Sequence, residues 1–162
     1  MLAEDKIEIV DFQNKYKEYF KSLNEEWITN FFEIEENDTK YLNNPEKLII
    51  EKGGAIKFAL LNNQVVGTCA LVKIDHNSYE LAKMAVSPKA QGKKIGYYLG
   101  IEILKQAKKL GAEKVILLSN KKLGPAINLY KKLGFKEVEI SKEDADAYKR
   151  VDIRMEINLQ DI

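Results

Sequence analysis

The sequence has too few of certain residues to build several common kinds of site. Its 162 residues contain one cysteine, Cys69, and one histidine, His76. A single cysteine excludes an intramolecular disulfide, and these two residues cannot form a structural zinc site. No apolar run approaches the roughly 20 residues that a membrane-spanning helix needs. The N-terminal stretch has acids where a signal peptide needs positive charge, so we expect a cytoplasmic location.

A large excess of one charge sign is also missing. The chain has 26 Lys and Arg against 25 Asp and Glu, a net charge of +1. This balance does not favour binding to nucleic acid or to an anionic membrane surface. Lysines gather within residues 89–109, and acids gather within 33–38 and 139–146. Any one such cluster is more simply a solvated face than a binding site.

The chain also lacks repeats, low-complexity tracts and linkers rich in proline or serine. A length of 162 residues with 45% hydrophobic residues suits one domain with a substantial core, so we expect residues 1–162 to form a single domain.

The apolar patterns predict a mixed α/β fold. An antiparallel meander comes first, then a strand–helix–strand crossover, then a closing antiparallel pair. Asn62-Asn63 suits a tight hairpin turn, Pro125 suits the first turn of a helix, and Gly134 suits a helix end. The expected strands are 6–12, 55–62, 64–75, 79–86, 114–120, 135–140 and 151–157, with main helices at 14–32, 94–110 and 125–133 and short helices at Asp38 and Pro45.

The segment "MAVSPKAQGKKIG" (84–96) joins a strand to a helix through a loop that contains glycine and lysine. Unpaired amides at a helix N-terminus and the helix dipole favour an anion there. The loop lacks the Gly-Lys-Ser/Thr of a Walker A motif and the glycine spacing of a dinucleotide-binding fingerprint. The residues alone leave two interpretations open, an anion site or a tight turn with solvated lysines.

The same loop resembles the acetyl-CoA pyrophosphate loop of the GCN5-related N-acetyltransferases (GNAT family), whose pattern is Gln/Arg-x-x-Gly-x-Gly/Ala. Gln91 and Gly96 occupy the first and last pattern positions, whereas Lys94 stands where the first glycine is usual. "AINLYKKLGF" (126–135) is similar to the family's fourth-helix signature, and the order of elements also matches. We expect Lys94 to have helical backbone angles, because left-handed angles would cost a lysine about 1 kcal/mol.

The resemblance implies a mostly antiparallel sheet of about seven strands, with helices on both faces and with the fourth and fifth strands splayed apart. It also implies acetyl-CoA as cosubstrate. The pantetheine arm would pair with the fourth strand and contact the end of the fifth, and the loop amides would hold the pyrophosphate. The residues implied are Met84, Ala85, Val86 and Asn120 for the arm, and Gln91, Gly92, Lys93, Lys94, Ile95, Gly96 and Tyr97 for the pyrophosphate.

Tyr130 is the candidate general acid, because a phenol that titrates near 10 stays protonated at neutral pH and can protonate a thiolate. The resemblance puts it at the family's tyrosine position; the alternative is a core aromatic on a stripe with Ala126 and Leu133.

Glu80 is the candidate base. Strict alternation puts it on one strand face with Ala82, Met84 and Val86, where burial would raise its pKa. The alternative is a strand-end carboxylate in water or in an ion pair. By the same alternation Lys83 lies on the opposite face, exposed to solvent.

The resemblance, together with these residues, implies an acetyl-CoA-dependent N-acetyltransferase that transfers the acetyl group directly to a primary amine of a small molecule, peptide or protein, with no metal. The alternative is a non-catalytic acyl-CoA-binding regulatory module on the same fold. A nucleic-acid-binding domain is disfavoured.

The resemblance assigns acceptor choice to residues 24–44 and 141–149. It makes the segment with Trp27, Phe31 and Phe32 one wall of the acceptor site, and it makes a homodimer a common assembly. The acids Glu33, Glu35, Glu36 and Asp38 could attract an amine, although a solvated helix end is the simpler interpretation.

Overall fold

The computed structural model describes residues 4–161, and within them seven strands form one sheet in the order β1-β2-β3-β4-β5-β7-β6. β4 and β5 run parallel, and the other neighbouring strands are antiparallel. This arrangement confirms the predicted fold class. The strands are β1 (Ile7–Asp11), β2 (Ala55–Leu61), β3 (Gln64–Lys73), β4 (Ser78–Val86), β5 (Lys114–Ser119), β6 (Lys136–Val138) and β7 (Ile153–Asn158).

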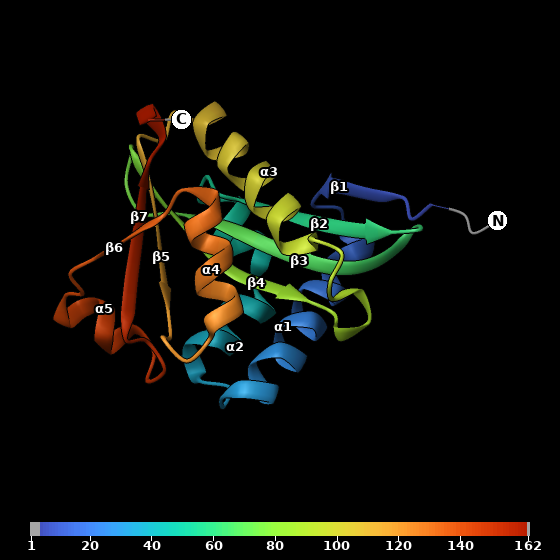
Figure 1. The fold of residues 1–162 in the computed structure, drawn as a ribbon, viewed down its shortest axis with the longest axis horizontal. Helices are drawn as coiled ribbons and strands as arrows, with labels where there is room; N and C mark the ends of the chain where they lie inside the picture. The colour runs from blue at the N-terminus through green and yellow to red at the C-terminus, as the bar shows by residue number, and fades with distance from the viewer. Residues whose placement is uncertain (1–3, 162) are drawn as a thin grey trace.

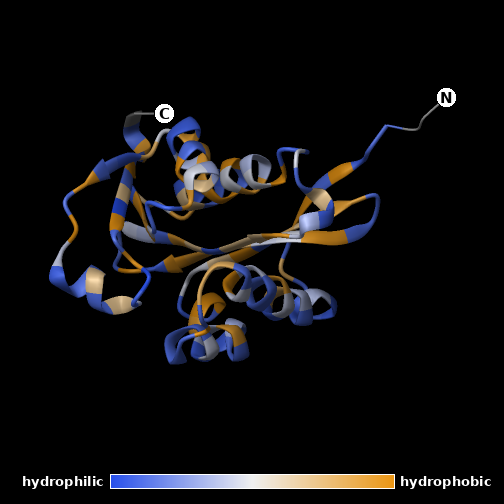
Figure 2. Ribbon diagram, turned by 60° about the horizontal axis from the view of Figure 1, so that its bottom comes forward, coloured by the Kyte–Doolittle hydropathy of each residue, from blue (hydrophilic) through white to orange (hydrophobic). Residues whose placement is uncertain are grey.

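Helices cover both faces of this sheet (Figure 1; Figure 2). α1 (Lys17–Phe31) and α2 (Glu36–Asn43) lie on one face, and α3 (Ile95–Lys109) and α4 (Gly124–Leu133) lie on the other. α5 (Lys142–Ala147) joins β6 to β7. None of the helices in the described part of the chain is long and apolar enough to cross a membrane. Short turns complete the list: η1 (Asn14–Tyr16), η2 (Glu46–Ile50), η3 (Pro88–Ala90) and η4 (Leu159–Asp161).

Two apolar clusters fill the spaces between the sheet and its helices. One lies under α3 and α4 and includes Leu99, Ile103 and Met155, which are fully buried. The other lies under α1 and α2 and includes Phe20 and Phe58. The helix expected over residues 94–110 ends at Lys109, and Leu110, its C-cap, is 40% exposed.

The turn residues behave as their chemistry predicts. Asn62 and Asn63 both have positive φ, 50° and 70°, as the hairpin between β2 and β3 requires. Gly134 ends α4 with a φ of 109°. At α2 the prediction was displaced: Glu35 is the N-cap, and Asp38 is the third helical residue, which bonds back to the Glu35 amide in a capping box.

β4 contains a bulge that strict alternation could not anticipate. Ala70 of β3 pairs with Ala82, but Thr68 pairs with Ala85, so β4 has one extra residue there. Lys83 occupies this bulge with a φ of 54°. The side chains therefore change sides after the bulge, and Met84 and Val86 pack with the cluster under α3 and α4. The prediction that Glu80 shares a face with Met84 and Val86 was wrong.

β4 and β5 separate immediately after a short parallel ladder. Their pairing ends at Glu80 opposite Ile116, although β4 continues to Val86 and β5 to Ser119. The predicted splay is confirmed. Beyond Glu80 the edge of β4 that faces β5 has no ladder partner among residues 4–161, and such an edge can accept an extended ligand as an added strand.

Candidate functional site

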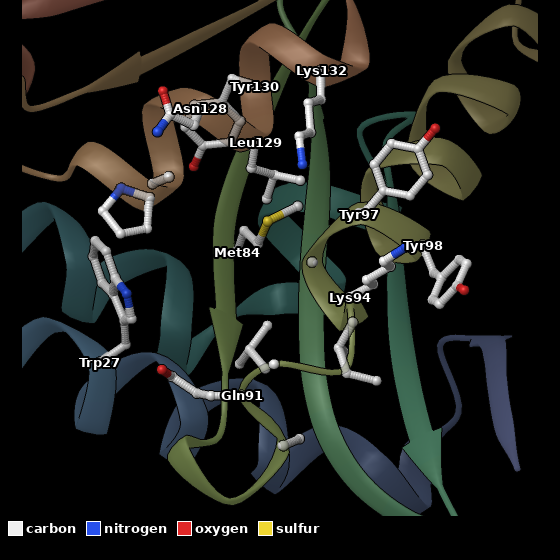
Figure 3. A pocket seen from close by; sticks show the side chains of 17 residues that line it. Trp27, Met84, Gln91, Lys94, Tyr97, Tyr98, Asn128, Leu129, Tyr130 and Lys132 are labelled. Carbon is white, nitrogen blue, oxygen red and sulfur yellow. The ribbon is translucent and has the colours of Figure 1, made fainter. Parts of the chain in front are cut away.

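A cleft of about 740 Å³ opens where β4, the start of α3 and α4 come together (Figure 3). Met84 and Val86 line it from β4, and Gln91 lines it from the loop. Leu129 and Tyr130 line it from α4. Trp27 of α1 lies on the side away from Lys94 and Tyr97 (Figure 3). Gly96 allows α3 to approach α4, because a Cβ on it would lie 2.9 Å from a methyl carbon of Leu129. Residues from four separate elements thus form one open site.

The loop before α3 is built differently from the prediction. Lys94 is the N-cap of α3 and has left-handed angles, φ 63° and ψ 24°, so the expectation of helical angles was wrong. The chain turns sharply between the loop and the helix at this position, in a conformation that glycine adopts without the steric cost it has for lysine. Gly92 also has positive φ, 81°.

This turn leaves a row of free donors. The amide of Tyr98 bonds to the Lys94 carbonyl, closing the first turn of α3. For the amides of residues 92–97 no acceptor lies within the described part of the chain. Three of these amides belong to the first turn of α3, a 15-residue helix, and three to the loop and N-cap before it, an arrangement that suits an anion such as phosphate.

Tyr130 lies where the cleft meets a second, smaller cavity, and it lines both. Its ring packs edge-on against Phe135 with 6.2 Å between the ring centres. Burial raises the pKa of Tyr130 above its usual value, so the phenol keeps its proton at neutral pH. The alternative of a core aromatic is thus partly right: the ring packs on the core, while its side chain also lines two cavities.

The smaller cavity, of about 90 Å³, lies on the α1 and α2 side of the sheet and meets the cleft at Trp27, Met84 and Tyr130, which line both. Phe32 also lines it, whereas Phe31 is 48% exposed and lines neither. The remaining polar walls come from Asn24, Glu80, Lys83, Ser119, Asn120, Tyr148 and Arg150.

Glu80 lines the smaller cavity, and the pKa of its carboxylate is raised. Burial raises its pKa to about 7; Asp144 adds to the rise, while Lys83 and Arg154 partly oppose it. Its carboxylate accepts no hydrogen bond and forms no ion pair among residues 4–161. A half-buried carboxylate that lines a cavity and has no donor among these residues is suited to take a proton near neutral pH.

Lys83 and Asp38 lie in a buried ionic cluster, contrary to both predictions of solvent exposure. Lys83 donates to Asp38 Oδ1 at 2.7 Å and to the Tyr148 hydroxyl at 2.9 Å. Arg150 binds both carboxylate oxygens of Asp38, at 2.8 and 2.6 Å. Although burial opposes it, the Arg150 and Lys83 bonds lower the pKa of Asp38 to about 2. Burial lowers the pKa of Lys83 despite the neighbouring Asp38.

Residues 12–135 match the family model described as "Acetyltransferase (GNAT) family". The chain belongs to this family. The predicted family is confirmed, and with it the enzyme class, an acetyltransferase that uses acetyl-CoA as its cosubstrate.

The individual proteins that this GNAT protein resembles share limited sequence identity with it. An uncharacterised N-acetyltransferase of Schizosaccharomyces pombe is 38% identical over 60 residues, a match that spans 37% of each protein. A GNAT acetyltransferase of Staphylococcus aureus Mu50 has a similar structure, with a TM-score of 0.85, 24% identity, and coverage of 95% of this chain and 99% of that one. An N-acetyltransferase of Thermoplasma acidophilum in complex with coenzyme A has a TM-score of 0.71 at 20% identity, covering 94% of this chain and 99% of that one.

Asn120 already has structural partners in this GNAT protein. Its Nδ2 donates to the Arg150 carbonyl at 2.7 Å, and its Oδ1 accepts from the Lys122 amide at 2.9 Å. One Nδ2 hydrogen is left for a ligand, so its contact with the pantetheine arm stays a prediction.

The sequence analysis did not single out Tyr148, which lies within residues 141–149 assigned to acceptor choice, or Arg150, which follows them. An arginine after an acidic segment gave no distinctive signal, because its partner Asp38 is 112 residues away.

Proposed function

We propose that this protein transfers the acetyl group of acetyl-CoA directly to a primary amine within a ternary complex. The observation that carries the proposal is the meeting of two cavities at Met84 and Tyr130, with an unpartnered Glu80 in the smaller one. The larger cavity would hold the cosubstrate and the smaller one the amine. The coenzyme A complex of a similar fold and the N-acetyltransferase name of the S. pombe relative support these two assignments.

The cosubstrate would lie along elements that have free donors. The unpaired edge of β4 at Met84, Ala85 and Val86 would bind the pantetheine arm, and one of its amides would polarise the thioester carbonyl. The amides of Gly92 to Tyr97 would bind the pyrophosphate, with Lys93 and Lys94 adding positive charge. Acetyl-CoA supplies an activated acyl group and a thiolate leaving group.

Two side chains would move the protons. Glu80 would accept a proton from the ammonium form of the acceptor, directly or through water, since its pKa of about 7 suits that task. Tyr130 would protonate the sulfur as it leaves. Both side chains line the smaller cavity, so both would lie beside the bound amine.

A binding assay and a turnover assay test the proposal. Calorimetry should show that acetyl-CoA binds, and a thiol-release assay over a panel of primary amines should show turnover with at least one. Tyr130→Phe should lower kcat by roughly tenfold or more, because general acid catalysis is lost, and should leave acetyl-CoA affinity nearly unchanged.

Absence of acetyl-CoA binding would overturn the proposal. Binding without turnover of any amine would instead favour a regulatory acyl-CoA-binding module. Full turnover by Tyr130→Phe would remove Tyr130 as the acid.

A further inference from the structure

The walls of the smaller cavity have an unusual distribution of charge. Lys83 and Arg150 line it together, and the side chain of Lys83 is only 7% exposed. One buried carboxylate, that of Asp38, is shared between these two cations. Glu35 touches Arg150 through a single bond of 3.3 Å and is partly exposed to solvent, which weakens its effect. Apart from Glu80 and Glu35, this wall thus combines two largely buried cations with one buried carboxylate.

The same residues have hydrogen-bond donors that their bonds within residues 4–161 do not use. Lys83 uses two of its three ammonium hydrogens, on Asp38 and Tyr148. The Tyr148 hydroxyl accepts from Lys83, and its own proton has no acceptor among the described residues. Arg150 donates three hydrogens to Asp38 and Glu35, so its Nε hydrogen and one Nη2 hydrogen can donate to a ligand. The wall can thus donate to an anionic group without breaking its own bonds.

Glu80 supplies the opposite character in the same small space. Its carboxylate has no donor partner in the described part of the chain, and it interacts electrostatically with Lys83 without forming an ion pair. The cavity thus presents one acceptor for an amine and, close to it, several donors for an oxyanion. With a volume of about 90 Å³, it leaves both groups little room to lie far apart.

The geometry points to an acceptor whose primary amine is adjacent to a carboxylate, that is, a free α-amino acid. We infer that its ammonium group faces Glu80 while its carboxylate is bound by Lys83, Tyr148 and Arg150. This inference rests on the proposed function and names the class of its acceptor. A polyamine or aminoglycoside has no carboxylate, so it would leave the free donors of this wall without an acceptor.

With this acceptor every bond and proton of the acetyl transfer is accounted for. The ammonium group gives one proton to Glu80, which passes it to solvent. The amine nitrogen then bonds to the acetyl carbon as the carbon–sulfur bond breaks. Tyr130 protonates the sulfur and regains a proton from the new amide nitrogen, so that an N-acetyl amino acid and free coenzyme A result.

Matched acceptors test the inference. Thiol release would be measured with alanine, methionine and phenylalanine, with the amine that each gives on decarboxylation, with each carboxyl amide, and with spermidine. For at least one set we expect kcat/KM for the amino acid to exceed that for its amine and its amide by about tenfold or more. Equal or faster turnover of the amines, the amides or spermidine would overturn the inference.

Variants of the wall add a second test. Lys83→Met should raise KM for the preferred amino acid by about tenfold to a hundredfold, because a buried charged hydrogen bond is lost, and should change kcat/KM for the decarboxylated amine much less. Tyr148→Phe removes only a hydroxyl, so it serves if Lys83→Met does not fold. Lys105→Met, at a side chain that is 70% exposed on α3, is the control and should change neither substrate.

The outcomes separate the two proposals. If amines are acetylated but amino acids are not, only the inference fails. If none of these amines is acetylated and acetyl-CoA does not bind, the proposed function fails as well. Equal effects of Lys83→Met on both substrates would show that Lys83 stabilises the fold and does not bind a carboxylate.

Discussion

For Glu80 the sequence predicted a carboxylate removed from bulk water, but it predicted neither the side chains on the same face nor the position of Lys83. An acid among apolar strand residues indicates a buried carboxylate, and the structure places Glu80 in a cavity wall with a raised pKa. Lys83, three residues later, was predicted on the solvent side by alternation. The bulge and Asp38 together bury it, and neither is visible in the local pattern.

The pH dependence of turnover should report Glu80. Because its pKa is about 7, kcat/KM should rise with pH up to about 7 and then level off. Glu80→Gln cannot accept the proton, so this inflection should vanish and the rate above pH 7 should fall roughly a hundredfold. The charged groups that act on Glu80, namely Lys83, Asp144 and Arg154, are unchanged in this variant. An inflection that persists in Glu80→Gln would assign it to another group.

The same substitution has a readout in stability. A carboxylate whose pKa is raised on folding holds its proton more tightly in the folded state. The folded protein therefore loses stability as pH rises from about 4.5 to about 7, by up to about 3 kcal/mol. Glu80→Gln should lack that loss, which urea unfolding at pH 5 and pH 8 would measure.

At the scale of elements, turn and cap residues were predicted well because each has a local physical cause. Asn62-Asn63, Pro125 and Gly134 mark the hairpin and the ends of α4 as expected. The two non-glycine residues with positive φ outside that hairpin, Lys83 and Lys94, were missed among residues 4–161. Tertiary contacts and the course of the chain fix the backbone angles of both residues, so local sequence propensity does not predict them.

The left-handed N-cap of α3 predicts an unusual effect of glycine. Lys94→Gly should relieve strain at φ 63°, which offsets the entropy that glycine loses on folding. Lys93→Gly relieves no such strain and serves as the matched control; its exposed ion pair with Asp5 contributes little. Chemical unfolding should find Lys94→Gly more stable than Lys93→Gly by about 1 kcal/mol. Equal stability would mean that Lys94 is not strained.

At the scale of the whole molecule, Asp38 joins parts that are distant in sequence. It lies on α2, and it binds Lys83 of β4 and Arg150 of the segment that leads to β7. The family resemblance located the region of acceptor choice, but it could not show this cluster. Charges at positions 38, 83 and 150 meet only when the complete sheet has formed.

Removing this shared carboxylate should be costly. Asp38→Asn leaves two buried cations without their common partner, and we expect a loss of about 3–5 kcal/mol in the free energy of unfolding. Asp11→Asn, which breaks an ion pair whose carboxylate is 79% exposed, should cost less than about 1 kcal/mol. Urea unfolding at neutral pH compares the two variants.

The sign of the pH effect gives a check on this prediction. The pKa of Asp38 is lowered to about 2, so its contribution is complete above about pH 4 and disappears as pH falls towards 2. The destabilisation by Asp38→Asn should therefore shrink on acidification. A loss that is small at neutral pH, or that does not change with acid, would show that the cluster is not a stabilising ion network.

The short parallel ladder between β4 and β5 has a further consequence, for the cohesion of the molecule. Three residue pairs, from Ser78–Lys114 to Glu80–Ile116, connect the first four strands to the last three through the sheet. Beyond these three pairs β4 and β5 are not hydrogen-bonded to each other, and a ligand would lie between them. A cosubstrate bound along the free edge of β4 and against α4 would act as a staple between the two halves, so its binding energy would also resist their separation.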